Sequence, residues 1–312
     1  MSEFDFSTTL GNAFFNTPIF TASGCASSGK ELAQFFPLRD IGAVVTKSVM
    51  NKPRYGRPTP RMAETPSGML NSIGLQGPGI EAFLANDIPW LVEQNSRIII
   101  SIAGETIEEY ATLARKVRSV AGISAIEVNI SCPNVENRGL VFACDPDASR
   151  RVIDGVRRTI GGELPIIAKL SPDVTNLPDI AKGVVESGAD ALALINTVLG
   201  MVINIETMRP HLGGNTGGLS GPAIRPVAVR AIYQVHAVMP EIPILGMGGV
   251  SSGRDALELI FAGASGVSVG TASFGNPHAA VDIQRELRDL LIAKGFPSLK
   301  SAVGYAHREA DL

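Results

Sequence analysis

Short apolar runs rich in valine, isoleucine and alanine recur along the chain, and each is bounded by glycine, proline or polar residues. Runs of this length and composition are typical of buried strands. We predict eight strands, at Thr17–Ser23, Gly42–Ser48, Arg97–Gly104, Ser124–Ser131, Pro165–Ser171, Ala189–Asn196, Ile242–Gly249 and Gly266–Thr271.

Amphipathic stretches lie between these runs and predict helices. They cover Thr106–Val120, Asp147–Ile160, Leu177–Ser187, Pro222–Val238, Ser252–Ala262 and Pro277–Lys294. Alternating strands and helices indicate an α/β fold with a parallel sheet, and eight units favour closure into a (β/α)8 TIM barrel. We expect residues 1–312 to form one such domain.

Four further segments interrupt or precede the regular alternation. The opening segment Phe4–Asn16 contains a Leu10-Gly11-Asn12 turn and predicts a hairpin that plugs the bottom of the barrel. Insertions follow strands two, four and six, at Val49–Gly77, Cys132–Asp145 and Val198–Gly221. We expect them to project over the C-terminal face, where TIM barrels carry their active sites.

The predicted strands begin apolar and end in polar residues or glycine. Lys47, Asn129, Lys169 and Asn196 all stand at or near strand ends, and Cys132 follows directly after one. Buried ammonium and amide groups need partners, so their convergence at one mouth predicts a ligand site there.

Strands seven and eight end in glycine and each leads into a helix, at Gly248-Gly249 and at Gly270-Thr271. Backbone amides at such positions bind phosphate in many barrels. No Gly-x-Gly-x-x-Gly follows the first strand and no Walker motif occurs, which favours a mononucleotide cofactor. FMN fits the surrounding amides and lysines. Pyridoxal phosphate stays open as an alternative, with Lys47 or Lys169 as its Schiff-base lysine.

Metal chemistry is disfavoured. The four histidines, His211, His236, His278 and His307, are scattered, and none ends a strand, so we predict that they are surface or loop residues.

The stretch Asn129-Ile130-Ser131-Cys132-Pro133-Asn134 places a thiol at a polar strand end. A thiol with a reference pKa of about 8.5 accepts protons near neutrality when neighbouring donors stabilise the thiolate. We therefore predict that Cys132 is a catalytic base and that Asn129 and Asn134 bind a planar polar substrate. Cys25 and Cys144 fit better as cysteines that pack as small hydrophobic residues.

Composition excludes several classes of protein. The net charge is -3, from 27 basic and 30 acidic residues, which provides no bulk attraction for nucleic acid or anionic membranes. Three cysteines do not make a disulfide framework, and no run approaches the length of a membrane span. We expect a cytoplasmic protein that binds neither nucleic acid nor membranes.

Several motifs together resemble dihydroorotate dehydrogenase, in particular the NAD-linked catalytic subunit of class 1B. They are residues 129–134 (NISCPN), Lys47, 71–76 (NSIGLQ), 195–197 (INT), 216–222 (TGGLSGP), 246–249 (GMGG) and 270–271 (GT). The resemblance implies oxidation of (S)-dihydroorotate to orotate in pyrimidine biosynthesis. Cys132 would remove the proton from carbon 5 while a hydride passes from carbon 6 to FMN, and Lys47 would balance the substrate carboxylate.

The resemblance also implies the residues that bind each molecule. Substrate would be bound by Lys47, Asn71, Ser72, Ile73, Gly74, Leu75, Asn129, Asn134, Asn196 and Thr197. FMN would be held by Ser23, Lys47, Ser48, Ser101, Asn129, Lys169, Ile195, Gly221, Gly248, Gly249, Gly270 and Thr271. Two positions depart from the family: Ser101 stands where an asparagine is common, and Cys144 has no role to carry over. The insertion that carries Cys132 is expected to close over the substrate as a lid.

Class 1B further implies a homodimer of catalytic subunits within a heterotetramer. The electron-transfer partner would carry FAD and a [2Fe-2S] cluster, which three separated cysteines in this chain cannot ligate. Two other functions remain open: a flavoenzyme resembling dihydropyrimidine dehydrogenase that acts on uracil or thymine, and a non-enzymatic barrel that binds a phosphate ligand.

Overall fold

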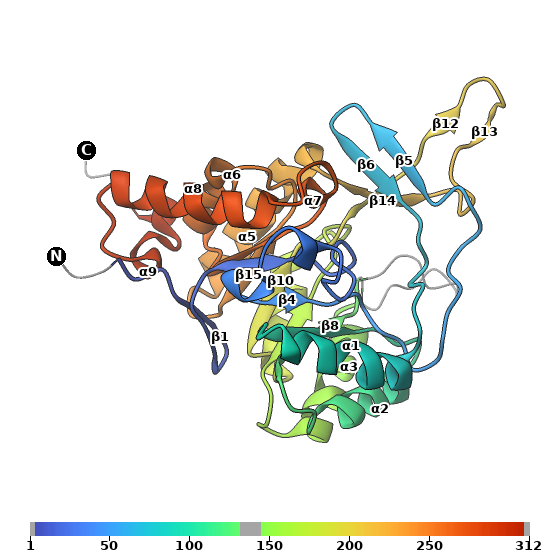
Figure 1. Ribbon diagram of the computed structural model, residues 1–312, viewed down its shortest axis with the longest axis horizontal. Coiled ribbons are helices and arrows are strands. Elements are labelled where there is room, and N and C mark those ends of the chain that lie inside the picture. The colour runs from blue at the N-terminus through green and yellow to red at the C-terminus, as the bar shows by residue number, and fades with distance from the viewer. Residues whose placement is uncertain (1–3, 132–144, 309–312) are drawn as a thin grey trace.

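The computed structural model describes residues 4–131 and 145–308 and has a parallel eight-stranded sheet at its centre. Its strand order is β3-β16-β15-β10-β9-β8-β7-β4, and a parallel bridge from Phe20 to Ala43 joins the first strand to the last. The predicted (β/α)8 barrel is confirmed (Figure 1). The strands are β3 (Ile19–Thr21), β4 (Val44–Val45), β7 (Ile98–Ile102), β8 (Ile123–Asn129), β9 (Ile166–Lys169), β10 (Ala191–Leu194), β15 (Ile244–Met247) and β16 (Gly266–Val269).

Helices cover the outside of the barrel, with α5, α6 and α8 on one side of the strands and α1, α2 and α3 on another (Figure 1). The six predicted helices are confirmed as α2 (Ile107–Val117), α3 (Pro146–Ile160), α4 (Leu177–Glu186), α5 (Arg225–Val238), α6 (Gly253–Ala262) and α8 (Ala279–Ala293). Among the described residues, the helices α1 (Ile80–Glu93), α7 (Ala272–Gly275) and α9 (Leu299–Ala302) were not predicted. Short 3-10 helices occur at η1 (Leu32–Gln34), η2 (Leu38–Asp40), η4 (Pro222–Ile224) and η5 (Tyr305–His307).

Local sequence explains where several helices begin. The Asp145 carboxylate accepts hydrogen bonds from the amides of Asp147 and Ala148 at the start of α3, and Pro146 occupies the first turn. The side chains of Thr106 and Ser252 cap α2 and α6 in the same way. Each cap satisfies an amide that has no partner within its helix, which stabilises the helix by about 1 kcal/mol.

The N-terminal hairpin fills the barrel from its lower end, as predicted. Strands β1 (Thr8–Leu10) and β2 (Ala13–Phe15) pair antiparallel. Leu10, Ala13 and Phe15 belong to a buried hydrophobic cluster. The other members of this cluster come from the barrel strands and the residues beside them, and none comes from a helix. Gly11 packs against Pro165 and Asp190, which precede β9 and β10. The hairpin thus lies at the amino ends of the strands and leaves the opposite mouth free for chemistry.

Two of the predicted insertions build one antiparallel sheet beside the barrel (Figure 1). Its order is β11-β14-β6-β5, which pairs residues 68–71 with residues 217–220. The strands are β5 (Met62–Thr65), β6 (Gly68–Asn71), β11 (Val198–Gly200) and β14 (Gly217–Ser220), and a further hairpin consists of β12 (Ile203–Asn204) and β13 (Arg209–Pro210). In the third insertion, Cys132–Asp145, residues 132–144 lie outside the described residues.

Across the described ranges, none of the helices combines the length and the apolar character needed to cross a bilayer.

The prediction that all four histidines are surface or loop residues is wrong for His236. This residue lies on α5, and only 9% of its surface is exposed. Its ring packs against Gly263, Gly304 and the ring of His307, and its Nδ1 atom has no hydrogen-bond partner among the described residues. The sequence did not indicate this burial, because Gly304 and His307, which pack against His236, lie about 70 residues away in the C-terminal segment.

Protonation of His236 is expected to destabilise the fold. Burial lowers the pKa of His236 below its ordinary value of 6.5, the neighbouring His307 lowers it further, and Glu241 opposes the change. Below pH 6.5 the unfolded chain therefore takes up a proton that the folded chain does not, and the free energy of unfolding falls until the lowered pKa is passed. Urea unfolding of His236→Gln should show a weaker fall below pH 6.5 than wild type. Identical slopes in both proteins would contradict this assignment.

Candidate functional site

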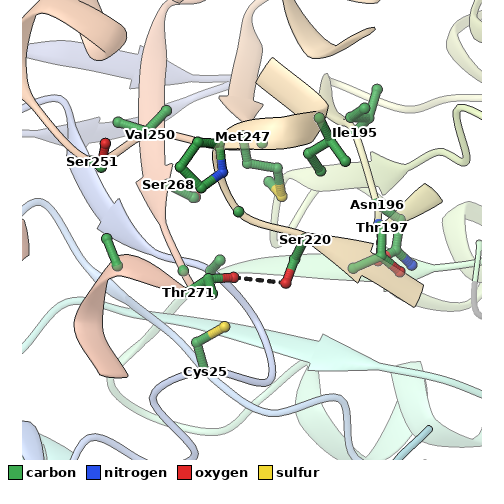
Figure 2. A pocket seen from close by; sticks show the side chains of 18 of the residues that line it. Cys25, Ile195, Asn196, Thr197, Ser220, Met247, Val250, Ser251, Ser268 and Thr271 are labelled. Carbon is green, nitrogen blue, oxygen red and sulfur yellow. Dashed lines mark hydrogen bonds between the residues drawn. The ribbon is translucent and has the colours of Figure 1, made fainter. Parts of the chain in front are cut away.

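A cavity of about 280 Å³ opens at the carboxyl ends of the barrel strands (Figure 2). Its wall includes Ser23 after β3, Lys169 at the end of β9, Ile195 after β10, Gly248 after β15 and Gly270 after β16. Parallel strands all end at this mouth, so residues far apart in the sequence meet there. The cavity therefore lies where the polar strand ends predicted a ligand site.

Lys169 is the principal charge in the cavity wall. It is 97% buried, with 3% of its surface exposed; its Nζ atom donates a hydrogen bond to Ser23 Oγ at 2.7 Å and lies 3.8 Å from Glu127 Oε1. A buried ammonium needs such partners. It remains at the cavity edge, where it can approach an anionic or carbonyl group of a ligand.

Cys25 lines the cavity (Figure 2). The sequence predicted only that it packs as a small hydrophobic residue and did not place it at the ligand site. Burial raises the pKa of its thiol, while Lys169 and Lys47 act in the opposite direction with smaller effects. The thiol is therefore neutral near pH 7 and offers an apolar surface. The Lys47 ammonium also lies near this segment, since a Cβ atom at Gly24 would be 3.8 Å from its Nζ atom.

The glycine-rich end of the cavity has a backbone that other residues would not adopt. Gly221, Gly248 and Gly249 have φ angles of 92°, 128° and 71°. A Cβ atom at Gly249 would lie 2.8 Å from the carbonyl oxygen of Gly221. Glycine is thus required here by conformation and close packing, and it also leaves the backbone open to a ligand.

Fewer backbone amides are available at the predicted anion site at the start of α6 than the sequence indicated. The amides of Ser251 and Gly253 already donate to the carboxylates of Asp255 and Glu286, at 3.0 and 2.6 Å. The glycine loops themselves remain as the candidate phosphate contacts. Nearby, Thr271 Oγ1 donates to Ser220 Oγ at 2.8 Å (Figure 2).

The predicted flavin-binding residues divide into three groups. Most line the cavity: Ser23, Lys169, Ile195, Gly221, Gly248, Gly249, Gly270 and Thr271. Lys47 and Ser48 line a second cavity of about 550 Å³. Ser101 and Asn129 are buried, and their side chains are hydrogen-bonded to other protein groups.

The predicted substrate-binding residues are more dispersed. Asn196 and Thr197 lie side by side in the wall of the first cavity (Figure 2), and Ile73 lines the second. Asn71 lies on β6, where its side chain donates to the carbonyl of Gly218 at 3.4 Å. Ser72, Gly74 and Leu75 follow in a turn in which Gly74 and Leu75 have positive φ angles. Cys132 and Asn134 lie outside the described residues.

A row of hydrogen-bonded side chains crosses the barrel at this mouth. Asn196 Nδ2 donates to Ser131 Oγ at 2.8 Å, and Ser131 Oγ donates to Asn129 Oδ1 at 3.0 Å. Asn129 Nδ2 donates to Ser48 Oγ at 2.9 Å. The Oγ atoms of Ser48 and Ser101 are 2.9 Å apart, and Ser101 Oγ donates to Glu127 Oε1 at 2.8 Å. We call Asn196, Ser131, Asn129, Ser48, Ser101 and Glu127 the polar row.

Glu127 was missed as a functional candidate in the sequence. It is fully buried on β8, between apolar neighbours Ile126 and Val128. A lone carboxylate inside an apolar run is costly unless it has charged or hydrogen-bonding partners, and that was the available signal. The bond to Ser101 also shows that this serine hydroxyl is engaged within the protein.

No group of three or more histidine, cysteine, aspartate or glutamate side chains forms a candidate metal site within residues 4–131 and 145–308.

A family model described as dihydroorotate dehydrogenase matches residues 6–291. The chain belongs to the dihydroorotate dehydrogenase family. This confirms the resemblance that the motifs indicated. The match covers all eight barrel strands and both insertions of the neighbouring sheet.

Members of the dihydroorotate dehydrogenase family with high similarity share one description, the catalytic subunit of dihydroorotate dehydrogenase B (NAD(+)). The protein from Desulforudis audaxviator (strain MP104C) is 49% identical over 291 residues, which cover 93% of this chain and 94% of that protein. The Geobacter sp. (strain M21) protein is 46% identical over 304 residues, covering 97% and 99%. The Bacillus cytotoxicus protein is 44% identical over 292 residues, covering 94% of each.

Proposed function

We propose that this protein oxidises dihydroorotate to orotate, with FMN bound in the cavity at the barrel mouth. The main support for this proposal is the cavity, which combines a buried ammonium group, hydroxyl groups and a glycine-rich end. The chain is also 44–49% identical to catalytic subunits of NAD-linked dihydroorotate dehydrogenases. Family membership favours FMN over pyridoxal phosphate, and it favours dihydroorotate over uracil or thymine.

The residues of the cavity fit a flavin mononucleotide. Gly248, Gly249, Gly270 and Thr271 would hold its phosphate, because their backbone is not shielded by large side chains. Lys169 and Ser23 would meet the polar edge of the ring. Ser268 lines the cavity with a buried hydroxyl that has no hydrogen-bond partner among the described residues, which fits a partner on the ligand.

Bound FMN would supply the acceptor for the hydride from carbon 6 of the substrate. The protein's own part is to orient the substrate and to move one proton. Lys47 would neutralise the substrate carboxylate, and Asn196 and Thr197 would bind the ring amides. Cys132 would take the proton from carbon 5, a role inferred from the sequence. Base and hydride acceptor must stand on opposite sides of a fixed ring, which the rigid barrel mouth favours.

Anaerobic mixing of the purified protein with dihydroorotate tests this function. We expect flavin absorbance in the protein, rapid bleaching by dihydroorotate and much slower bleaching by dihydrouracil, which has no carboxylate for Lys47. Faster bleaching by dihydrouracil would favour the dihydropyrimidine dehydrogenase-like alternative. Colourless protein that takes up no added FMN would favour a non-enzymatic barrel.

We propose that the flavin's electrons leave through a partner subunit with FAD and a [2Fe-2S] cluster, because the similar proteins are described as NAD-linked catalytic subunits.

A homodimer within a heterotetramer is supported by exposed apolar side chains at and between β11, β12 and β13, namely Leu199, Met201, Ile203, Ile205 and Met208. Sedimentation of the isolated chain as a monomer would contradict the dimer. We propose a cytoplasmic location, which cell fractionation tests.

A further inference from the structure

Glu127 combines complete burial with a position directly beside the flavin-site lysine. On strand β8, Ala125 and Asn129 point to the same face as Glu127, because alternate residues of a strand share a face. Ala125 belongs to the hydrophobic cluster inside the barrel. The carboxylate therefore stands above the apolar filling of the barrel, on the side of the mouth. Its Oε1 atom contacts Ser101 and Lys169, while Oε2 has no hydrogen-bond partner among the described residues.

The carboxylate of Glu127 determines the direction of the two serine hydrogen bonds at its end of the polar row. A carboxylate only accepts hydrogen bonds, so Ser101 must use its hydroxyl proton toward Glu127. The bond between Ser48 and Ser101 can then run only from Ser48, and Ser48 in turn accepts from the amide nitrogen of Asn129. Each donor points one step closer to the carboxylate. The orientation of the Asn129 amide agrees with this direction, and the backbone N–H of Ser131, which donates to Asn129 Oδ1 at 3.3 Å, fixes the same orientation from the other side.

The same carboxylate also holds Lys169. The ammonium lies 3.8 Å from Glu127 Oε1 on one side and bonds to Ser23 Oγ on the other. Side-chain exposure of the two charged groups is 4% and 0%, so solvent screens them little. Removal of one charge would leave the other buried and uncompensated.

We infer that Glu127 is a positioning residue that acts on the flavin through Lys169 and the polar row, and that its charge lowers the midpoint potential of bound FMN. The inference rests on the proposed function. Lys169 favours the negative charge that reduction adds, and Glu127 offsets part of that effect. Neutralising Glu127 makes reduction easier, whereas loss of a structural contact alone would leave the potential unchanged.

Redox titration of Glu127→Gln tests the electrostatic role. Glutamine keeps the size and can still accept from Ser101, but it lacks the charge. We expect the equilibrium constant for two-electron reduction of bound FMN to rise about tenfold, an upward shift of about 30 mV in midpoint potential. Glu127→Asp retains the charge and is expected to have a potential closer to wild type than Glu127→Gln.

A second arm uses the apoprotein and needs no cofactor. We expect Glu127→Gln to lower the melting temperature by about 5 °C or more, because Lys169 loses its counter-charge. The double variant Glu127→Gln/Lys169→Met, in which neither charge remains, should recover most of this loss. The control for the redox titration of the FMN-bound protein is Asp190→Asn. It removes one charge of the Arg157–Asp190 pair before β10, at the opposite end of the barrel, and is expected to leave the flavin potential unchanged.

The outcomes separate this inference from the proposed function. Wild-type protein that binds no FMN would overturn both. If wild type binds FMN and is bleached by dihydroorotate, a Glu127→Gln protein with the wild-type potential overturns the inference alone. A lowered melting temperature with an unchanged potential also overturns it, because Glu127 would then have only a structural role.

Discussion

Replacing Cys132 with serine is expected to slow the bleaching of flavin by dihydroorotate about 10²- to 10⁴-fold near neutral pH, the usual contribution of a general base. A serine hydroxyl loses its proton far less readily than a thiol with a reference pKa of about 8.5. Stopped-flow absorbance under anaerobic conditions measures the rate directly. The slowing should diminish as pH rises, because a weaker acid gives up its proton more readily in alkaline solution.

The control for this experiment is Cys144→Ser, the same exchange at a cysteine to which no role is carried over. We expect it to bleach at a rate close to wild type. Equal rates in wild type and Cys132→Ser would remove Cys132 from the mechanism. A loss of FMN binding in Cys132→Ser would instead show that the residue serves the site structurally, and flavin absorbance of the purified variant reveals this before any substrate is added.

Phe15→Ala is expected to lower the free energy of unfolding by about 3–5 kcal/mol, the usual cost of removing a large buried aromatic side chain. Phe15 is 1% exposed and packs edge-on against Phe20, with ring centroids 5.0 Å apart. It fills the lower barrel from the hairpin, where a cavity has little room to collapse because the strands around it are hydrogen-bonded on both sides. Urea unfolding measures the change.

Phe14→Ala provides a matched control on the neighbouring residue of the same hairpin. Its side chain is 52% exposed because successive residues of a strand point to opposite faces. We expect Phe14→Ala to change the free energy of unfolding by less than about 0.5 kcal/mol. Comparable losses in the two variants would show that the hairpin does not plug the barrel as the buried cluster indicates.

The sequence alone predicted every barrel strand and six helices, because hydrophobic periodicity is a local property of the chain. The hairpin plug was also accessible, since Phe4–Asn16 combines a turn with alternating apolar residues. The polar strand ends predicted the mouth as the site, because parallel strands in a barrel necessarily end on one face. Helix α1 was missed: the run from Ile80 to Glu93 contains Pro89 and follows a long insertion, which obscured its pattern.

Only the tertiary structure decided which distant residues meet. The pairing of β6 with β14 joins residues about 150 positions apart, and no local pattern in either insertion indicates it. The environments of Cys25, His236 and Glu127 likewise depend on partners from other strands and from the C-terminal segment. Hydrophobic periodicity predicts which face of a helix or strand is buried. Whether a buried side chain lies beside a charge, an aromatic ring or a cavity depends on how the helices and strands pack together. That difference separates the fold, which the sequence largely determined, from the arrangement of charge at the mouth.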